Sequence, residues 1–482
     1  MKKYWQKPLA TVMLAAALVG CSDFENININ PNSPSSPSTA GLLTGVIRNV
    51  GTINAQVGPG AANIVPAMYV QQFGDVTYIE DSKYKTINFS YNGWYAGPLA
   101  NLQHIIELNT KEDTKISAAA FGSNNNQIAT ARILKAYFFQ WITDRWGDVP
   151  YSEALKGDGD FTPAFDKQEA IYTDLFKEWK EAAAQFDGGK AFQGDILLGG
   201  NTAQWKKFAN SLRLIAALRL SKVKPDLGKQ EFAAALKDGV FTAGTDNVQY
   251  KFLSESSNEN PLYNNYTVNN RKDFAVSDVM VDYLKKTADP RLPFLAAKNI
   301  LGEYVGVPYA VGGKKAQDVS LIGSILSQQN SAVNVLTYAQ VLFAQAEAAK
   351  LGWTTDNAKT LYEAAVQASL QQWMGASYTE AAYKAFIAKP EVAYTEATAL
   401  EKIGTQRWIA LYFQGTEAWS EWRRTGYPVL KPAANTLNGG TAIPRRLAYP
   451  VTENTLNQEN YKAVVASQGA DDHYTRVWWD KQ

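Results

Sequence analysis

Several residue types and segment types are scarce in this chain, and each scarcity excludes a class of protein. Among 482 residues there is one cysteine, Cys21, so the chain cannot form an internal disulfide. The two histidines, His104 and His473, are too few for a histidine-based zinc site and argue against a histidine-activated nucleophile. The formal net charge is +1 and no basic block occurs, which argues against a nucleic acid as partner.

Long apolar runs are also missing after the first 21 residues. Lysines near the amino terminus precede a short apolar stretch, Leu9–Val19, which is followed by Gly20 and Cys21. This order is typical of a secretory signal, and the stretch is too short to span a bilayer. The four residues Leu18–Cys21, LVGC, resemble a bacterial lipobox. Residues 1–21 are therefore predicted to be a lipoprotein signal peptide, and Cys21 is predicted to be the lipidated residue. A plain signal peptide with a chance cysteine is the alternative.

Residues 22–39 have a composition that cannot bury a core. They are rich in Asn, Ser and Pro, and we expect them to form a flexible tether. Because one acyl chain anchors a protein only marginally, the tether requires a multiply acylated cysteine. Residues 40–482 are then predicted to form a single domain that reaches the membrane through its lipid anchor alone.

The stretch 336–374 predicts a helical hairpin. Apolar residues recur at helical spacing on both sides of a turn at Gly352. The order of Ala346, Gly352, Ala358 and Tyr362 is similar to that of a tetratricopeptide repeat, in which each hairpin buries its apolar face by stacking on neighbours. An ordinary helical hairpin is the alternative. Helical periodicity recurs through residues 126–223, so the fold is predicted to be mostly α.

Two smaller features bear on local structure. Asp166 with Glu169 predicts a capping box at the start of a helix Ala170–Phe186. A calcium loop is disfavoured there because Pro163 stands where an EF-hand needs glycine. Further on, residues 397–427 combine large aromatic rings with Arg423 and Arg424, which predicts a buried packing hub with cation–π contacts. The carboxyl-terminal VWWDK is expected to pack back on the domain.

Aromatic residues also occur in two polar loop regions, about 75–98 and 254–323. Rings beside amide and carboxylate groups suit sugar binding, since the ring face packs on apolar C–H patches while polar groups take hydroxyls. Packing of the rings into the core is the alternative, and it applies most directly where Trp94 and Tyr95 precede a helix. Exposure is expected for Tyr78 and Tyr84. The candidate ligand-binding residues are Tyr78, Trp94, Tyr95, Tyr263, Tyr266, Arg271, Tyr304 and Tyr309.

Several blocks of the chain together resemble the SusD/RagB family of Bacteroidetes outer-membrane lipoproteins. Beside the lipobox and the Asn/Pro tether they are WGDVPYSEAL, FDKQEAIYTDL, NSLRLIAALR, NPLYNN, DPRLPF, TYAQVLFAQAEAA, IALYFQGTEAWSEWRRTGYP and IPRRLAYP. The resemblance implies a SusD-like fold, with tetratricopeptide-like hairpins and a loop-rich irregular subdomain. It further implies a lipid-anchored protein at the cell surface that passes cargo to a SusC-like TonB-dependent transporter.

The cargo implied by the resemblance is usually an oligosaccharide and in some members an oligopeptide. The family's aromatic arc has its nearest positional counterparts here in Trp94 and Tyr95, and in Tyr263, Tyr266, Tyr304 and Tyr309. A protein–protein scaffold and a glycoside hydrolase are the other hypotheses; the latter needs two carboxylates at a suitable distance, and the sequence marks no such pair. We expect a binding protein without enzymatic activity, cofactor or metal ion.

Overall fold

The computed structural model describes residues 37–55, 64–157 and 161–481, so the predicted signal peptide, Cys21 and most of the tether lie outside the described residues. Residues Thr39–Gln482 cluster as one compact unit. Its longer helices are α3 (Thr39–Asn54), α6 (Ala100–Thr110), α8 (Asn124–Trp146), α9 (Gln168–Gln185), α10 (Thr202–Arg219), α11 (Pro225–Asp238), α13 (Asp278–Lys286), α16 (Tyr338–Lys350), α17 (Ala358–Met374), α18 (Glu380–Ile387), α19 (Ala399–Ala410), α20 (Gly415–Thr425) and α22 (Gln458–Gln468).

Short elements connect these helices. The short helices are α4 (Val65–Tyr69), α5 (Asn92–Trp94), α7 (Lys115–Ala118), α12 (Pro261–Tyr263), α14 (Leu292–Leu295), α15 (Ser324–Ser327) and α21 (Val451–Leu456), and η2 (Tyr95–Leu99) is a π-helical turn that runs into α6. The prediction of a mostly α fold is confirmed. Within the described residues, none of the helices is both long and apolar enough to cross a bilayer.

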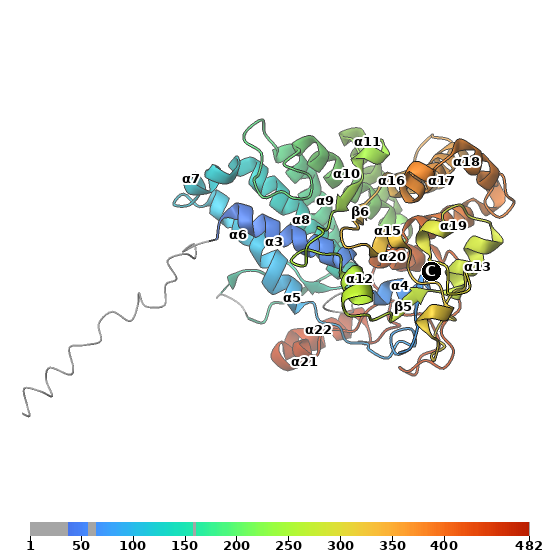
Figure 1. The fold of residues 1–482 in the computed structure, drawn as a ribbon. Helices are drawn as coiled ribbons and strands as arrows, with labels where there is room; N and C mark the ends of the chain where they lie inside the picture. Colours follow the sequence, from blue (N-terminus) through green and yellow to red (C-terminus); the bar gives the residue numbers. More distant parts are fainter. Residues whose placement is uncertain (1–36, 56–63, 158–160, 482) are drawn as a thin grey trace, which may run out of the picture. The chain divides into compact units, whose positions relative to one another are not determined.

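The helices form a continuous array in which each one packs on the next (Figure 1). Helix α6 packs on α8, α8 on α9, α9 on α10, and α10 on both α11 and α16, while α16 packs on α17 and α19. Stacked helical hairpins need this succession of neighbours, because a single hairpin leaves one apolar face uncovered. The tetratricopeptide-type geometry itself stays a prediction.

Local sequence explains where the array's helices begin and turn. The side chain of Ser123 accepts a hydrogen bond from the Asn126 N–H at the start of α8, and Thr337 forms a capping box with Gln340 at the start of α16. Between α16 and α17 the chain turns at Gly352, whose φ of 72° lies in the left-handed region that glycine adopts without strain.

The predicted capping box at α9 is wrong. Helix α9 begins at Gln168. The Gln168 N–H donates to Oδ1 of Asp148 at 2.9 Å, and Asp148 lies in the connection between α8 and α9. Asp166 instead accepts hydrogen bonds from the N–H groups of Tyr151 and Ser152, at 3.0 and 2.8 Å. A carboxylate that is distant in sequence therefore caps the helix, and a pattern of neighbouring residues cannot reveal it.

Strands are short and occur as three antiparallel pairs in the described chain. They are β1 (Phe73–Asp75) with β5 (Phe274–Val276), β2 (Val149–Pro150) with β3 (Phe165–Asp166), and β4 (Val248–Tyr250) with β6 (Val333–Leu336). In the β1–β5 pair, Phe73 is opposite Val276 and Asp75 is opposite Phe274. This pair joins the first aromatic loop region to the second.

A cluster of buried ion pairs ties the array to the carboxyl-terminal helices. We call it the arginine cluster; it comprises Arg219, Arg407 and Arg424 with Glu347, Glu417 and Glu421. Arg424 binds both oxygens of Glu347, at 2.6 and 2.7 Å, while Glu421 pairs with all three arginines. Because buried charges are tolerated only when they are paired and hydrogen-bonded, the cluster holds α10, α16, α19 and α20 in one arrangement.

The predicted aromatic hub is confirmed beside this cluster. Trp419 is fully buried, and the Arg423 guanidinium carbon lies 3.7 Å from the centre of its ring. The carboxyl terminus does pack back on the domain, because Trp479 is also fully buried and lies 4.6 Å from the same guanidinium. Its indole N–H donates to Asp144 Oδ1 of α8 at 2.9 Å.

Candidate functional site

The β1–β5 pair places parts of the two predicted loop regions next to each other. Past the end of β1, the Val76 N–H donates to the Asp273 carbonyl at 2.8 Å. The Val76 carbonyl in turn accepts from the Lys314 N–H at 3.2 Å, so a third segment joins the other two. Residues 76–78, 270–273 and 314–316 therefore meet at one edge, although about 200 residues separate the first segment from the second.

These three segments enclose a recess of about 500 Å³ that opens to solvent. We call it the Tyr78 recess; it is lined by Thr77, Tyr78, Asn270, Arg271, Lys272, Asp273 and Ala316. The Tyr78 side chain is 63% exposed, and Arg271 Nε donates to Asp273 Oδ2 at 3.0 Å. The recess offers an aromatic face beside amide, ammonium and guanidinium donors, which is the combination that recognises a sugar ring and its hydroxyls.

Two further tyrosines of the loop regions, Tyr309 and Tyr84, are hydrogen-bonded to each other and do not line the recess. The Tyr309 hydroxyl donates to the Tyr84 hydroxyl at 3.5 Å, and Tyr84 in turn accepts from the Ala433 N–H at 3.0 Å. Tyr84 is 1% exposed, so the prediction that it is exposed is wrong. Desolvation raises the pKa of Tyr309, so its hydroxyl stays protonated and can act as a donor.

A buried carboxyl group lies at the end of β1. Asp75 Oδ2 accepts from the Ser82 N–H at 3.0 Å and from its hydroxyl at 2.6 Å. Burial raises the pKa of Asp75 to about 7, because desolvation outweighs the opposing effect of the Ser82 hydrogen bonds. These bonds fix the loop 76–82 that carries Tyr78.

The remaining tyrosines of the second loop region differ in exposure. Tyr266 is only 8% exposed, and its hydroxyl donates to the Phe274 carbonyl at 2.6 Å, so its burial removes it from the candidate ligand contacts. Tyr304 is half-buried, with Lys298 Nζ 5.6 Å from the centre of its ring. Tyr263 is half-buried in α12, whose first N–H groups are capped by Asn260.

Trp94 and Tyr95 lie apart from the Tyr78 recess, at the start of the helical segment that leads into α6. The Trp94 ring centre is 5.2 Å from that of Trp141 and 6.3 Å from that of Phe138, both in α8. Tyr95 donates its hydroxyl to the Pro150 carbonyl at 2.6 Å. For both residues the structure favours the alternative of packing against the core.

Tyr95 also lines a larger cavity, of about 820 Å³, that the sequence analysis did not find. We call it the α6–α21 cavity, because its walls come from η2 and α6, from the segments on either side of residue 160, and from α21. Its lining includes His104, Glu107, Phe161 and Leu456. These residues belong to segments that are far apart in sequence and carry no shared pattern, so no sequence signal could have grouped them.

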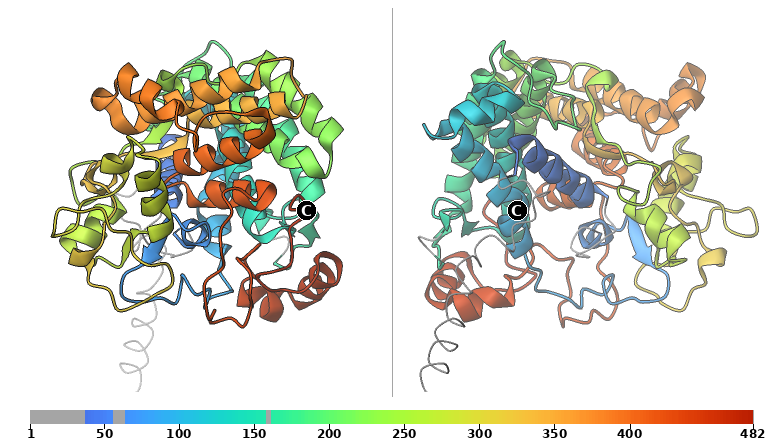
Figure 2. Two further views of the ribbon diagram at one scale, coloured as in Figure 1. Left: turned by 90° about the vertical axis from the view of Figure 1, so that its right-hand side faces the viewer. Right: turned by 60° about the vertical axis from the view of Figure 1, so that its left-hand side comes forward.

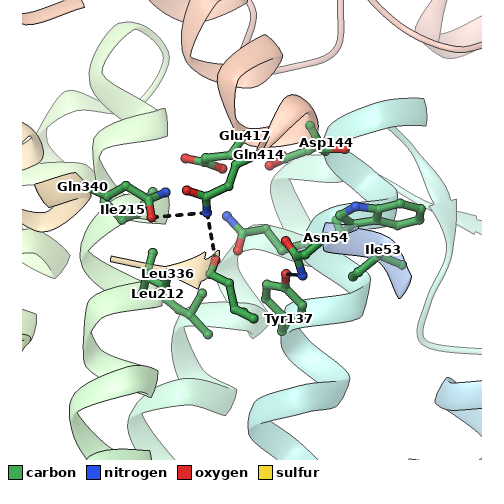
Figure 3. A pocket seen from close by; sticks show the side chains of 14 residues that line it. Ile53, Asn54, Tyr137, Asp144, Leu212, Ile215, Leu336, Gln340, Gln414 and Glu417 are labelled. Atoms are coloured by element: carbon green, nitrogen blue, oxygen red, sulfur yellow. Dashed lines mark hydrogen bonds between the residues drawn. The ribbon is translucent and has the colours of Figure 1, made fainter. Parts of the chain in front are cut away.

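A third space lies inside the helical array (Figure 3). Its volume is about 50 Å³, and side chains of Asn54, Tyr137, Gln340 and Gln414 point towards it. Gln414 donates to the Val335 carbonyl at 3.2 Å and to Gln340 Oε1 at 3.4 Å. At roughly 30 Å³ per water molecule, this volume suits one or two waters and excludes an oligosaccharide. Within the residues that the structure describes, no group of acidic, histidine or cysteine side chains is arranged to hold a metal ion.

Comparison with known proteins identifies the kind of scaffold on which these surfaces are found. A family model, SusD-like, described as starch-binding and associating with the outer membrane, matches residues 31–450. Among curated proteins, none matches the chain.

Solved structures agree with the family model. A chitin-binding protein is 31% identical, with a TM-score of 0.80 over 92% of this chain and 100% of its own. A chitin-binding SusD homologue from Flavobacterium johnsoniae is 26% identical, with a TM-score of 0.74 over 92% of this chain and 99% of its own. A SusD homologue from Bacteroides fragilis is 26% identical, with a TM-score of 0.77 over 93% of this chain and 100% of its own.

Proposed function

Since the chain belongs to the SusD-like family of outer-membrane-associated binding proteins, we propose that it is a nutrient-binding lipoprotein at the cell surface. Lipidated at Cys21, it captures an oligosaccharide and passes it to a SusC-like TonB-dependent transporter. The observation that carries the proposal is the Tyr78 recess, in which an exposed ring lies beside hydrogen-bond donors on the family's scaffold.

Two structural relatives suggest which sugar to test first. Both are described as chitin-binding, and one of them is 31% identical to this chain over nearly its whole length. The first ligand to test is therefore an N-acetylglucosamine oligomer. The acetamide of such a sugar offers a carbonyl to Arg271 or Lys272, and its methyl group adds apolar contact for the Tyr78 ring.

The acidic content of the recess supports binding without turnover. Asp273 is the one acidic side chain among the lining residues that the structure describes, and it is paired with Arg271 at 3.0 Å. Glycoside hydrolysis takes two carboxylates, one to protonate the leaving oxygen and one to activate water or attack the sugar. The recess therefore serves to hold and release a sugar.

Transfer of cargo requires an additional contact with the transporter. We assign that contact to the helical hairpins, where a rigid array offers an extended surface for a stable interface. Ligand binds when the lipoprotein swings away from the transporter like a lid, and closure delivers it. Stacking with shallow hydrogen bonding gives the modest affinity that handing on the cargo requires.

The test is calorimetry of the full chain in detergent against oligomers of N-acetylglucosamine, a panel of other neutral glycans and a mixed peptide digest. Tyr78→Ala and Arg271→Ala are each expected to weaken binding about tenfold, since each removes one principal contact. Ile116→Ala, at a residue that is 80% exposed on α7, is the control and should bind as the wild type does.

Three results would change the proposal. Heat from the peptides alone would replace the oligosaccharide with an oligopeptide as cargo. The absence of measurable heat with every ligand would favour a protein–protein scaffold. Release of new reducing ends from a bound glycan over time would show that the protein is an enzyme.

A further inference from the structure

The α6–α21 cavity is a space separate from the Tyr78 recess. The two share no lining residue. In both views of Figure 2, the helices α21 and α22 lie on the opposite side from the yellow segment near residue 300. The cavity is also the larger of the two, at about 820 Å³ against about 500 Å³, and falls within the usual range for small-molecule sites.

Hydrogen bonds connect several of the residues that line the cavity. Tyr91 donates its hydroxyl to Glu453 Oε1 at 3.0 Å, and Asn457 donates its amide to Glu453 Oε2 at 3.2 Å. The same amide group donates to the Pro163 carbonyl at 2.9 Å. Each oxygen of Glu453 accepts one hydrogen bond, so this carboxylate joins α21 to Tyr91 on the other side of the cavity.

The walls combine apolar and polar surface. On the helix side, the half-buried Tyr95 lines the cavity together with the small residues Ala96 and Ala100. On the opposite side, Phe161 is 82% exposed and Leu456 is 73% exposed, although both border the cavity. Large apolar groups held this far in water at the rim of a cavity gain free energy when a ligand covers them.

Polar side chains also line the cavity and could hydrogen-bond to the hydroxyls of a sugar. They are Asn92, Gln103, His104, Glu107, Lys156 and Thr452. The charged lining residues are Glu107, Glu453 and Lys156, and Glu107 is also paired with Lys111 at 3.4 Å. The lining therefore has no strong excess of either sign and favours a neutral ligand over an ionic one. A flat ring with apolar faces and a polar edge matches this lining.

We propose that the α6–α21 cavity is a second saccharide-binding site, which takes a short neutral oligosaccharide between Phe161 and the helix side of the cavity. A second site lets one chain hold a long glycan at two points, so that release from one point does not lose the polymer. The proposal does not depend on the Tyr78 recess, because no residue is common to both.

The experiment isolates the cavity with variants of the full chain in detergent. The background is the double variant Tyr78→Ala/Arg271→Ala, in which the recess is disabled through two exposed residues. Ligand-observed NMR, which detects weak binding, is carried out with N-acetylglucosamine tetramer, maltotetraose and cellotetraose. Ala96→Trp then fills the cavity, and Ala381→Trp, the same change at an exposed alanine on α18, is the matched control.

The background variant is expected to retain binding of at least one tetrasaccharide. Adding Ala96→Trp should weaken that binding by tenfold or more, while Ala381→Trp leaves it unchanged. Phe161→Ala should weaken it about fivefold without altering the thermal midpoint, because the ring is mostly in water. Unchanged circular dichroism confirms that each variant is folded.

Two results would overturn the proposal. The first is that no tetrasaccharide binds the background variant, so that the recess is the only saccharide site. The second is that residual binding is indifferent to Ala96→Trp and to Phe161→Ala. Failure of the proposed function gives a different pattern, in which Tyr78→Ala and Arg271→Ala leave wild-type binding unchanged.

Discussion

The arginine cluster and the Tyr78 recess place the same residue types in opposite environments. Arg424 is 2% exposed and binds two carboxylates, whereas the Arg271 side chain is 61% exposed and has one partner, Asp273. In the cluster, every charge is committed to another helix. In the recess, the guanidinium keeps donors that face solvent, and a ligand can use them.

This difference separates stability from binding. A buried charge that loses its partner costs the fold heavily, whereas an exposed pair contributes little to stability. Residues of the cluster should therefore alter unfolding when they are changed, and residues of the recess should alter ligand affinity alone.

Glu421→Gln is expected to lower the free energy of unfolding by about 3–5 kcal/mol, because it leaves three buried guanidinium groups short of a partner. Chemical denaturation measures the change. Glu459→Gln, at an 87% exposed partner of Lys462, is the control and should unfold like the wild type. A loss below about 1 kcal/mol in Glu421→Gln would show that the cluster does not hold the helices together.

Trp94→Ala is expected to lower the free energy of unfolding by about 2–3 kcal/mol, since the ring packs on Phe138 and Trp141 of α8. Binding at the Tyr78 recess should be unchanged. Denaturation together with calorimetry measures both quantities on one sample. If Trp94→Ala instead left stability intact and abolished binding, Trp94 would be a ligand-binding residue.

Asp75 and Glu421 should give stability opposite dependences on pH. The pKa of Asp75 is raised from 3.8 to about 7, so the folded state holds its proton more tightly and stability falls as the pH rises between these values. The pKa of Glu421 is lowered by its arginine partners, so its contribution is present above 4.5 and is lost as the pH falls below it. Asp75→Asn should flatten the first slope alone in thermal unfolding followed from about pH 2 to about pH 8.

Tyr266→Phe should cost about 1 kcal/mol of unfolding free energy, because its buried hydroxyl donates to the Phe274 carbonyl. Tyr78→Phe, at a 63% exposed ring, should leave unfolding unchanged. Thermal unfolding of the pair compares two tyrosines of the predicted loop regions directly. Equal effects would mean that exposure does not separate them.

Sequence reasoning succeeded where local pattern determines structure. The periodicity of residues 336–374 corresponds to α16 and α17, with the turn at Gly352, and the density of rings beside Arg423 corresponds to the buried hub. These features depend on neighbours within a few turns of helix, so the sequence displays them.

Local sequence patterns did not predict features that depend on segments distant in the chain. Asp148, not Asp166, caps α9, and Tyr84 and Tyr266 are buried although both lie in polar stretches. The sequence indicates Tyr78 and Arg271 as candidate site residues, but their adjacency depends on the strands FGD and FAV, which are too short to show a period. The lining of the α6–α21 cavity was missed for the same reason.

The β1–β5 pair also determines when, during synthesis, the Tyr78 recess can exist. About 200 residues separate Phe73 from its partner Val276. Closing so long a loop comes late in folding, because the entropy cost of closure precedes the stabilising contacts that it allows. A chain that stops before residue 270 contains the sequence of α8–α11 but lacks one wall of the recess. Under the proposed function, a molecule can therefore bind cargo in the recess only after its first and second loop regions have joined.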